Sequence, residues 1–99
     1  MESRAGDGFG IMMGDGLAVY DFDHCVVGGG VVTDRVAGYA RAIVDPVLYV
    51  EASSSGDGVH VFVESYGKSF KRGGVEFYSR ARFVRMTGCP FRGLESGRG

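Results

Sequence analysis

Short apolar runs alternate with glycine-rich or polar turns along most of this chain, which is the pattern of a strand-rich protein. Gly14-Asp15-Gly16 separates the first two runs and has the turn chemistry of a β-hairpin, so we expect these two strands to pair. A basic loop is expected over residues 66–74. The runs predicted as strands are residues 9–13, 17–23, 47–52, 59–63, 75–78 and 83–87.

A helix is expected over residues 34–44, where apolar positions recur at helical spacing. Thr33 or Asp34 can cap its start, and Pro46 follows its end. One helix beside several strands indicates an α+β fold with a mostly antiparallel sheet, and the helix should pack on one face of that sheet. The apolar positions with helical spacing are Val36, Ala40, Ile43 and Val44.

Side-chain alternation separates an apolar face from a polar face in three of the predicted strands, because positions i and i+2 point to the same side of a strand. Within residues 17–23, Asp21 and Asp23 have the opposite phase to the apolar positions Ala18, Tyr20 and Phe22. Two later strands carry His60 and Glu76 in the same polar phase. If the helix covers the apolar faces, these four polar side chains share the open face and converge where their strands are neighbours.

The composition fits one small domain spanning residues 1–99, with 44% hydrophobic residues and too little length for a second core. Cys25 and Cys89 form no CxxC pair, so we expect neither a disulfide framework nor a structural zinc site. No apolar run approaches the roughly 20 residues of a membrane helix, and no apolar leader is evident, which predicts a cytoplasmic protein without a membrane partner. Residues 89–99 are rich in Gly and Arg and are expected to fray.

Charge is unevenly distributed, although the formal net charge is only -1. Residues 1–63 contain three Lys or Arg against nine Asp or Glu, whereas residues 64–99 contain eight against three. A basic surplus of this kind suits a surface that meets a phosphate backbone, and it is equally compatible with an ordinary solvated surface. The candidate backbone contacts are Lys68, Lys71, Arg72 and Arg80.

Asp21, Asp23 and Glu76 have the ligand chemistry of a divalent-metal site. Two aspartates at i and i+2 of a strand have Cα atoms about 6–7 Å apart, so both can reach cations bound between them. Carboxylates suit Mg²⁺ or Mn²⁺, and crowding them without a cation raises at least one pKa. Two such ions about 4 Å apart support nucleotidyl transfer, and His60 could bind the incoming triphosphate. If they do not share a site, Asp21 and Asp23 are ordinary turn-forming acids at a strand end, His60 is a packed histidine, and Glu76 is a surface glutamate.

The Ser/Gly turn that follows residue 52 offers backbone N–H groups and hydroxyls to phosphate oxygens, and its glycines allow close backbone approach. An ordinary hairpin loop would have the same composition. The candidate nucleotide-binding residues of this turn are Ser53, Ser55, Gly56 and Gly58.

Three segments carry the candidate residues, namely AVYDFDHC with Asp21 and Asp23, YVEASSSGDGVHVFV with His60, and GVEFYSRARFVRMTG with Glu76. In this order and spacing they resemble the motifs of the archaeo-eukaryotic primase superfamily, in particular the bifunctional primase/polymerase domains of phages and plasmids. The resemblance covers residues 17–88. The pattern E-x-S-x-S-G-x-G-x-H is matched at Glu51, Ser53, Ser55, Gly56, Gly58 and His60, and the later Y-S, R and T-G are matched at Tyr78, Ser79, Arg82, Thr87 and Gly88.

The resemblance implies an RRM-like sheet with its active site on the face opposite the helix. It implies primer synthesis or extension from ribo- or deoxynucleoside triphosphates on a DNA template, with two Mg²⁺ or Mn²⁺ ions on Asp21, Asp23 and Glu76. His60 and Arg82 would contact the nucleotide. Domains of this family are usually longer than this chain, so the expected partners include a separately encoded helicase or a further primase subdomain. If a phage or plasmid encodes the protein, it is expected in the cytoplasm of the bacterial host.

Three alternatives use the same residues differently. A metal-dependent nuclease would need the same carboxylates but would cleave DNA. A haloacid-dehalogenase-like phosphatase would use Asp21 as nucleophile and Asp23 as acid/base, although Cys25 stands where that motif has threonine. A non-catalytic module for single-stranded nucleic acid or a protein partner would instead stack bases on Phe62 and Tyr78.

Overall fold

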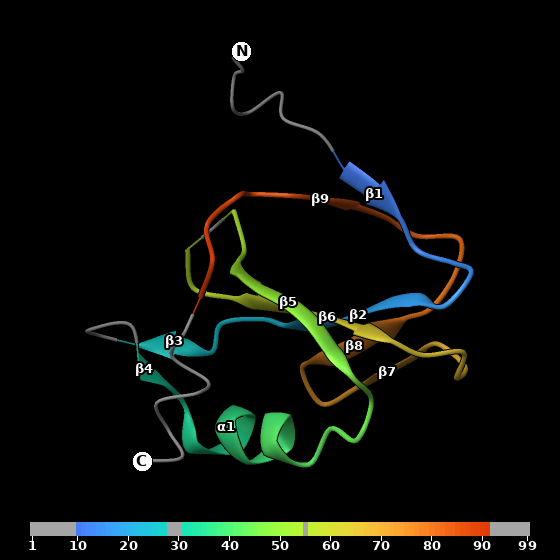
Figure 1. The fold of residues 1–99 in the computed structure, drawn as a ribbon. Coiled ribbons are helices and arrows are strands. Elements are labelled where there is room, and N and C mark those ends of the chain that lie inside the picture. Colours follow the sequence, from blue (N-terminus) through green and yellow to red (C-terminus); the bar gives the residue numbers. More distant parts are fainter. Residues whose placement is uncertain (1–9, 28–30, 55, 92–99) are drawn as a thin grey trace.

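The centre of the fold is a five-stranded antiparallel sheet, seen in a computed structural model that describes residues 10–27, 31–54 and 56–91 (Figure 1). Its strand order is β5-β6-β2-β8-β7, so β2 is the central strand and has a neighbour on each side. The protein is therefore α+β with a mostly antiparallel sheet, as predicted. The strands are β2 (Leu17–Phe22), β5 (Val47–Ala52), β6 (Val59–Glu64), β7 (Phe70–Arg72) and β8 (Val75–Tyr78).

The two faces of this sheet are covered by different elements (Figure 1). Helix α1 (Asp34–Arg41) lies on one side, and a two-stranded ribbon of β1 (Gly10–Met12) and β9 (Phe83–Arg85) crosses the other. A second short ribbon pairs β3 (Val26–Val27) with β4 (Val31–Val32) ahead of the helix. The face predicted to be open is thus partly covered by β1 and β9.

Helix α1 begins where the sequence predicts and ends earlier. The Thr33 Oγ1 accepts a hydrogen bond from the Val36 N–H at 3.5 Å, which caps the first turn. The helix stops at Arg41 rather than at residue 44, and the Val44 side chain is 92% exposed. The predicted last turn of the helix is therefore wrong, because Val44 belongs to the loop that leads into β5.

The helix side of the sheet holds the main apolar core. Every second residue of β2, β6 and β8 points to this side, and the buried face of α1 packs against them. The arrangement confirms the predicted apolar faces of these strands. The buried members of this cluster, called here the helix-side core, are Ala18, Phe22, Cys25, Val32, Val36, Ala37, Val59, Val61, Val63, Val75 and Phe77.

The predicted pairing of the first two strands is wrong. Gly14 and Leu17 close a tight turn through reciprocal backbone hydrogen bonds of 2.9 and 3.0 Å, as the turn chemistry indicates. Beyond that turn the strands separate, and β1 pairs with β9 in the register Gly10↔Arg85 to Met12↔Phe83. The reason lies in the sheet, because both edges of β2 are already hydrogen-bonded to β6 and β8.

Further strand pairing occurs where loops or frayed residues were expected. The basic loop over residues 66–74 contains β7, which forms a hairpin with β8 through Gly73 and Gly74, both at positive φ. Cys89 and Phe91 form backbone hydrogen bonds with β5, so the first residues of the predicted tail are held against the sheet edge. Residues 92–99 lie outside the described part of the chain.

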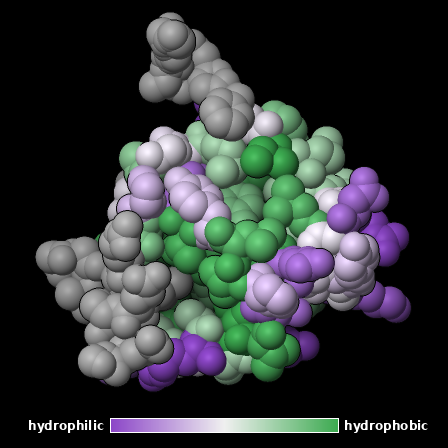
Figure 2. All heavy atoms as spheres, viewed as in Figure 1, coloured by the Kyte–Doolittle hydropathy of each residue, from purple (hydrophilic) through white to green (hydrophobic). Residues whose placement is uncertain are grey.

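Apolar side chains are also gathered on the surface, where Figure 2 shows a hydrophobic area in the middle of the view, over β5 and the loop before it. Val44, Val47 and Leu48 are more than half exposed there, at 92%, 53% and 56%. Hydrophilic residues occupy the end of the molecule to the right in this view.

Candidate functional site

A row of polar side chains crosses all five strands of the sheet on the face opposite α1. The register pairs Glu51 with His60, His60 with Asp21, Asp21 with Glu76, and Glu76 with Lys71. Directly paired residues of antiparallel strands have side chains on the same side of the sheet. The predicted common face for Asp21, His60 and Glu76 is therefore confirmed as a placement, and we call these five residues the polar row.

The centre of the polar row contains buried polar atoms without partners. The His60 Nε2 lies 3.5 Å from the Asp21 Oδ1, and the His60 Nδ1 lies 3.9 Å from the Glu51 Oε2. The Asp21 Oδ1 and the His60 Nδ1 are both buried, and neither has a hydrogen-bond partner among the residues that the structure describes. Buried polar atoms are normally satisfied, so this pair is where a bound polar or charged group would find unmet bonding capacity.

The Asp21 carboxyl is shifted toward its protonated form. Its pKa is raised from 3.8 to about 6, mainly because the carboxyl is partly buried; His60 lowers the pKa, and the carboxylates of Asp23 and Glu76 raise it. The sequence-based expectation of a raised carboxyl pKa is right in direction, but burial contributes more to the shift than the crowding of carboxylates. A divalent cation beside Asp21 would reverse the shift, because it stabilises the ionised carboxylate.

A pocket of about 270 Å³ opens over the centre of the polar row. Asp21 and His60 lie on the sheet below it, and β9 borders it from the other side. Asp23, one residue beyond the end of β2, is exposed and borders the same pocket. The residues that line the pocket are Val19, Asp21, Asp23, Ser53, Ser54, His60, Tyr78, Arg82, Phe83, Val84 and Arg85.

Glu76 is next to Asp21 in the register but does not line the pocket. Its Oε1 accepts a hydrogen bond from the Tyr78 hydroxyl at 2.5 Å, and its Oε2 lies 3.9 Å from the Lys71 Nζ. Within residues 10–27, 31–54 and 56–91, no group of three or more His, Cys, Asp or Glu side chains is arranged to hold a metal ion. The structure thus brings Asp21 and Asp23 to the pocket and directs the Glu76 carboxylate to Tyr78.

Arg82 lies at the pocket with its guanidinium carbon 4.3 Å from the centre of the Tyr78 ring. A guanidinium over an aromatic face is held by a cation–π interaction and keeps its N–H donors available. Arg82, predicted to contact a nucleotide, is therefore placed where an anionic ligand of the pocket would meet it.

The Ser/Gly turn contributes a wall of the pocket rather than a full phosphate cradle. Ser53 lines the pocket, and its Oγ accepts a hydrogen bond from the Gly58 N–H at 3.1 Å. A Cβ at Gly58 would lie 2.8 Å from the Phe22 carbonyl oxygen, so only glycine fits there. Gly56 closes the turn at φ 86 and, like Gly58, is not among the lining residues. Ser55 lies outside the described residues.

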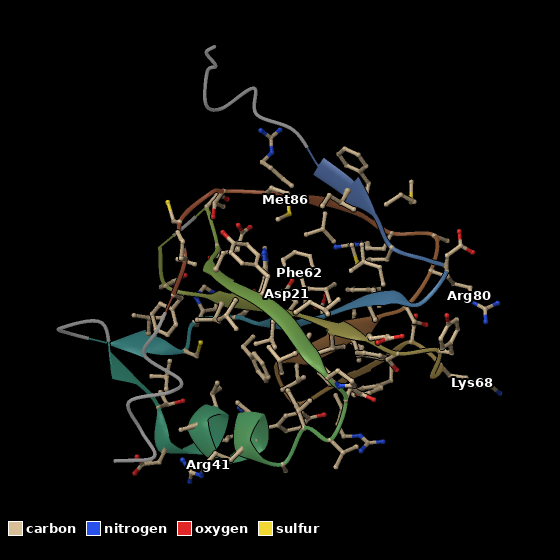
Figure 3. The ribbon with its side chains drawn as sticks, in the orientation of Figure 1. Asp21, Arg41, Phe62, Lys68, Arg80 and Met86 are labelled. Atoms are coloured by element: carbon tan, nitrogen blue, oxygen red, sulfur yellow. The ribbon has the colours of Figure 1, made fainter. Side chains whose placement is uncertain are left out.

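The four basic residues predicted to hold a nucleic-acid backbone do not form one surface. Lys71 ends the polar row, whereas Arg72 lies 5.6 Å over Phe70, which packs against the helix-side core. Lys68 and Arg80 lie together at the end of the molecule beyond the polar row (Figure 3). The four residues therefore do not share one face, because strand alternation sends Lys71 and Arg72 to opposite sides of the sheet.

Glu51 matches the second sequence motif, but the sequence assigned it no role in the site. Its side chain is 0% exposed, and its two oxygens accept hydrogen bonds from the backbone N–H groups of Thr87 (2.9 Å) and Gly88 (3.1 Å). It thereby holds the segment after β9 against β5 and faces His60 at the same time. Glu51 shares the phase of Tyr49 in β5 and pairs with His60, so side-chain alternation at the end of this strand could have identified it.

Phe62 does not serve as an open stacking platform. Its side chain is 3% exposed and packs with Met13, Val19 and Val84 in a second apolar cluster, called here the ribbon-side core. The prediction that bases stack on Phe62 is therefore wrong, because the β1–β9 ribbon covers this part of the sheet. Tyr78 is partly buried and contacts Glu76 and Arg82.

Comparison with known proteins gives no relative from which a function could be transferred. No protein-family model matches the chain, and no similar curated protein or solved structure is found. In the part of the chain that the structure describes, no helix is long and apolar enough to cross a membrane. The residues of the pocket and the resemblance of the three sequence motifs therefore remain as the indications of function.

Proposed function

We propose that this chain carries the catalytic site of a primase/polymerase-type nucleotidyltransferase, which joins nucleotides on a DNA template with two Mg²⁺ or Mn²⁺ ions. The observation that carries the proposal is the pair of buried, unpartnered atoms, Asp21 Oδ1 and His60 Nδ1, below a pocket that Asp23 and Arg82 also line. A carboxylate pair on one side and a guanidinium on the other fit a ligand that brings both cations and phosphates.

Asp21 and Asp23 are the residues that would hold the metal ions. The raised pKa of Asp21 supports this role, since a cation beside a carboxyl that lies near two other acids would offset their repulsion and stabilise its ionised form. The bound ions would supply activation of the primer hydroxyl and stabilisation of the leaving pyrophosphate. Glu76 adds negative charge beside Asp21, and its carboxylate can turn to the ions if it exchanges its bond to the Tyr78 hydroxyl.

The remaining residues of the pocket would hold the nucleotide. Arg82 has its guanidinium fixed over Tyr78 and would neutralise a phosphate oxygen. His60, between Asp21 and Glu51, would donate a hydrogen bond to the triphosphate, and Ser53 lines the same pocket. The template and the nucleoside triphosphate are thus the proposed ligands, and a separately encoded helicase or further primase subdomain is the proposed partner in the cytoplasm.

The fold is compatible with this proposal at the level of architecture. The order β5-β6-β2-β8 with α1 on one face is compatible with the RRM-like core that the resemblance implies, and the polar row lies on the opposite face. In this arrangement the helix stabilises the sheet, and the ligands would enter the pocket between the other face and β9.

The test is incorporation of labelled ribo- and deoxynucleotides on a single-stranded template with Mg²⁺ or Mn²⁺, with and without a primer. Asp21→Asn and Asp23→Asn should lower incorporation by at least about a hundredfold, since each removes a metal-binding charge from the transition state. Asp34→Asn, an exposed acid on the first turn of α1, is the matched control and should retain full incorporation. Unfolding curves of each variant establish that the fold is kept.

Each other outcome identifies a different activity and overturns the proposal. Shortening of the template in the same reaction would indicate a nuclease that uses the same carboxylates. Release of phosphate without polymer would indicate a phosphatase with Asp21 as nucleophile. Template binding without turnover, unaffected by Asp21→Asn, would indicate a non-catalytic binding module.

A further inference from the structure

A second pocket, of about 320 Å³, lies at the end of the molecule where Lys68 and Arg80 are found (Figure 3). It contains no residue of the polar row and shares no residue with the pocket over Asp21. Its lining residues are Gly14, Asp15, Gly16, Tyr66, Ser79 and Arg80. Tyr66, Lys68 and Arg80 are together called the basic corner.

Ser79 links the two chain segments that carry Lys68 and Arg80. It is a buried residue whose Oγ donates a hydrogen bond to the Gly67 carbonyl oxygen at 2.5 Å and whose N–H donates to the Ser69 Oγ at 3.1 Å. Lys68 lies between these two anchored residues, and Arg80 directly follows Ser79 in the chain. The loop after β6 and the connection after β8 are thus fixed to each other, with one exposed cation on each.

Tyr66 presents an aromatic ring beside these cations. The residue is 75% exposed, and a Cβ at Gly16 would lie 2.7 Å from its hydroxyl oxygen, so the ring rests against the Gly16 backbone. The adjacent Ser65 N–H donates a hydrogen bond to the Gly16 carbonyl oxygen at 2.9 Å, which fixes the segment there. A large ring supported on one side and exposed on the rest is suited to stacking on a planar ligand.

We propose that the basic corner binds single-stranded nucleic acid, with a base stacked on Tyr66 and the backbone phosphates on Arg80 and Lys68. Aromatic stacking beside cations is the common mode of single-strand binding, because every base has a π-face and every nucleotide a phosphate. Asp15, exposed in the turn after β1, limits where the phosphates can lie, since its carboxylate repels them from that side of the pocket. A duplex would not fit this mode because its bases are already stacked and paired.

The basic corner is connected to the first pocket by a short segment. Arg80 lines the second pocket and Arg82 lines the first, and only Ala81, at φ 55, separates them. A strand held at the basic corner can therefore continue along the connection between β8 and β9 toward Asp21. Single-strand binding at the basic corner stands without the proposed polymerase activity, whereas its role in guiding the template rests on that activity.

The test is fluorescence anisotropy with a labelled oligothymidylate of about 12 nucleotides, a length within the usual site sizes, in EDTA and without nucleotide. Tyr66→Ala should weaken binding about tenfold or more, whereas Tyr66→Phe keeps the ring and should bind like the unaltered protein. Arg80→Gln should weaken binding and reduce the slope of log K against log salt by about 0.7. Asp15→Asn should bind more tightly, because the repulsive carboxylate is removed.

Arg41→Gln is the matched control, because Arg41 is an exposed arginine at the end of α1, far from the basic corner in Figure 3. It should leave the affinity unchanged. Equal losses for Arg41→Gln and Arg80→Gln would show diffuse charge attraction and overturn the proposal, as would unchanged binding by Tyr66→Ala. Tyr66→Ala should also leave the affinity for a blunt duplex of equal length unaltered.

The two proposals fail separately. Asp21→Asn should keep its affinity for the oligothymidylate, because the measurement contains no metal or nucleotide. Absence of incorporation by the unaltered protein, together with a specific loss of binding in Tyr66→Ala and Arg80→Gln, would leave the basic corner in place and remove the polymerase proposal. If the unaltered protein incorporates nucleotides while Tyr66→Ala and Arg80→Gln bind the oligothymidylate normally, the polymerase proposal would stand and the basic-corner proposal would be overturned.

Discussion

The two faces of the central sheet use the same strands for opposite purposes. Phe22 and Asp21 are adjacent in β2, yet Phe22 is fully buried in the helix-side core whereas Asp21 lies at the centre of the polar row. The helix-side core is apolar throughout, and the Tyr20 hydroxyl at its edge is hydrogen-bonded to Asp45 at 3.1 Å. On the other face, the Asp21 Oδ1 and the His60 Nδ1 have no hydrogen-bond partner among the described residues.

This difference shows where the molecule is stabilised and where it is available for chemistry. Buried apolar area favours folding, whereas a buried carboxyl with a raised pKa and an unpartnered imidazole nitrogen oppose it. A face that carries such groups requires stability from elsewhere in the fold, and the helix-side core provides it. The ribbon-side core is smaller, with Met13, Val19, Phe62 and Val84 as its buried members, and it borders the pocket.

The largest effect is expected from comparing Phe22→Ala with Phe62→Ala. The two rings are almost equally buried, at 0% and 3% exposure, but they lie on opposite faces. Phe22→Ala should lower the free energy of unfolding by about 4 kcal/mol, because the densely packed helix-side core retains the cavity. Phe62→Ala should cost about 3 kcal/mol, because the pocket beside it allows neighbours and water to fill the space. Urea unfolding followed by circular dichroism measures both.

A domain of this size can lose its fold after a loss of about 4 kcal/mol, so Phe22→Leu and Phe62→Leu provide the same comparison with smaller cavities. The order of the two losses should be kept in this pair. A larger loss for Phe62→Leu than for Phe22→Leu would show that the face with the polar row carries more of the stability than the helix-side core.

The next effect concerns how much the Asp21 carboxyl lowers the free energy of unfolding, and how this loss depends on pH. The folded Asp21 carboxyl has a pKa of about 6 against 3.8 in its usual state, so the native protein binds its proton more tightly than the unfolded chain. This contribution favours the native state fully below about pH 4 and is lost as the pH rises through 6, by at most about 3 kcal/mol. In EDTA, Asp21→Asn should therefore be more stable than the unaltered protein at pH 8, and the difference should shrink toward pH 4.

Mn²⁺ sharpens the same measurement. At pH 8, millimolar Mn²⁺ should raise the melting temperature of the unaltered protein, because the cation binds the ionised carboxylates of the native state, and it should leave Asp21→Asn unchanged. Asp34→Asn, with its carboxyl on α1, controls for the loss of a charge. Equal stability of Asp21→Asn and the unaltered protein from pH 4 to pH 8 would contradict the burial of a destabilising carboxylate at this position.

The sequence predicted the faces of the sheet well because alternation is a local property. His60, Asp21 and Glu76 were assigned to one face from period-two phase alone, and the register places them in adjacent pairs. Strand partners were less predictable, because the turn at Gly14 and Leu17 is local whereas the choice of β9 as the partner of β1 depends on the occupied edges of β2. The β1–β9 ribbon buries Phe62, so the burial of Phe62 could not be predicted without the pairing of β1 with β9.

The orientation of a single side chain was also beyond what phase could predict. Tyr78 stands two positions after Glu76 on the same side of β8. Its hydroxyl donates a hydrogen bond to the Glu76 carboxylate, which the sequence assigned to a metal site. The role of Glu51 required the position of Thr87 and Gly88, residues far along the chain whose backbone N–H groups donate to it. Alternation indicates which side of the sheet a residue faces, and tertiary contacts decide what it meets there.

The smallest of the three effects concerns the two backbone hydrogen bonds that stabilise Glu51, a fully buried carboxylate on the polar face. Glu51→Gln keeps the shape but turns one acceptor into an NH₂ donor that faces a backbone N–H of Thr87 or Gly88, so one of the two hydrogen bonds is lost. The free energy of unfolding should fall by about 2 kcal/mol. Amide hydrogen exchange should accelerate at Thr87 and Gly88 while the strands of the helix-side core keep their protection. Glu64→Gln, an exposed glutamate at the end of β6, should change neither quantity. Unchanged protection at Thr87 and Gly88 would mean that the segment after β9 is held by its other contacts with β5, and that Glu51 acts on His60 alone.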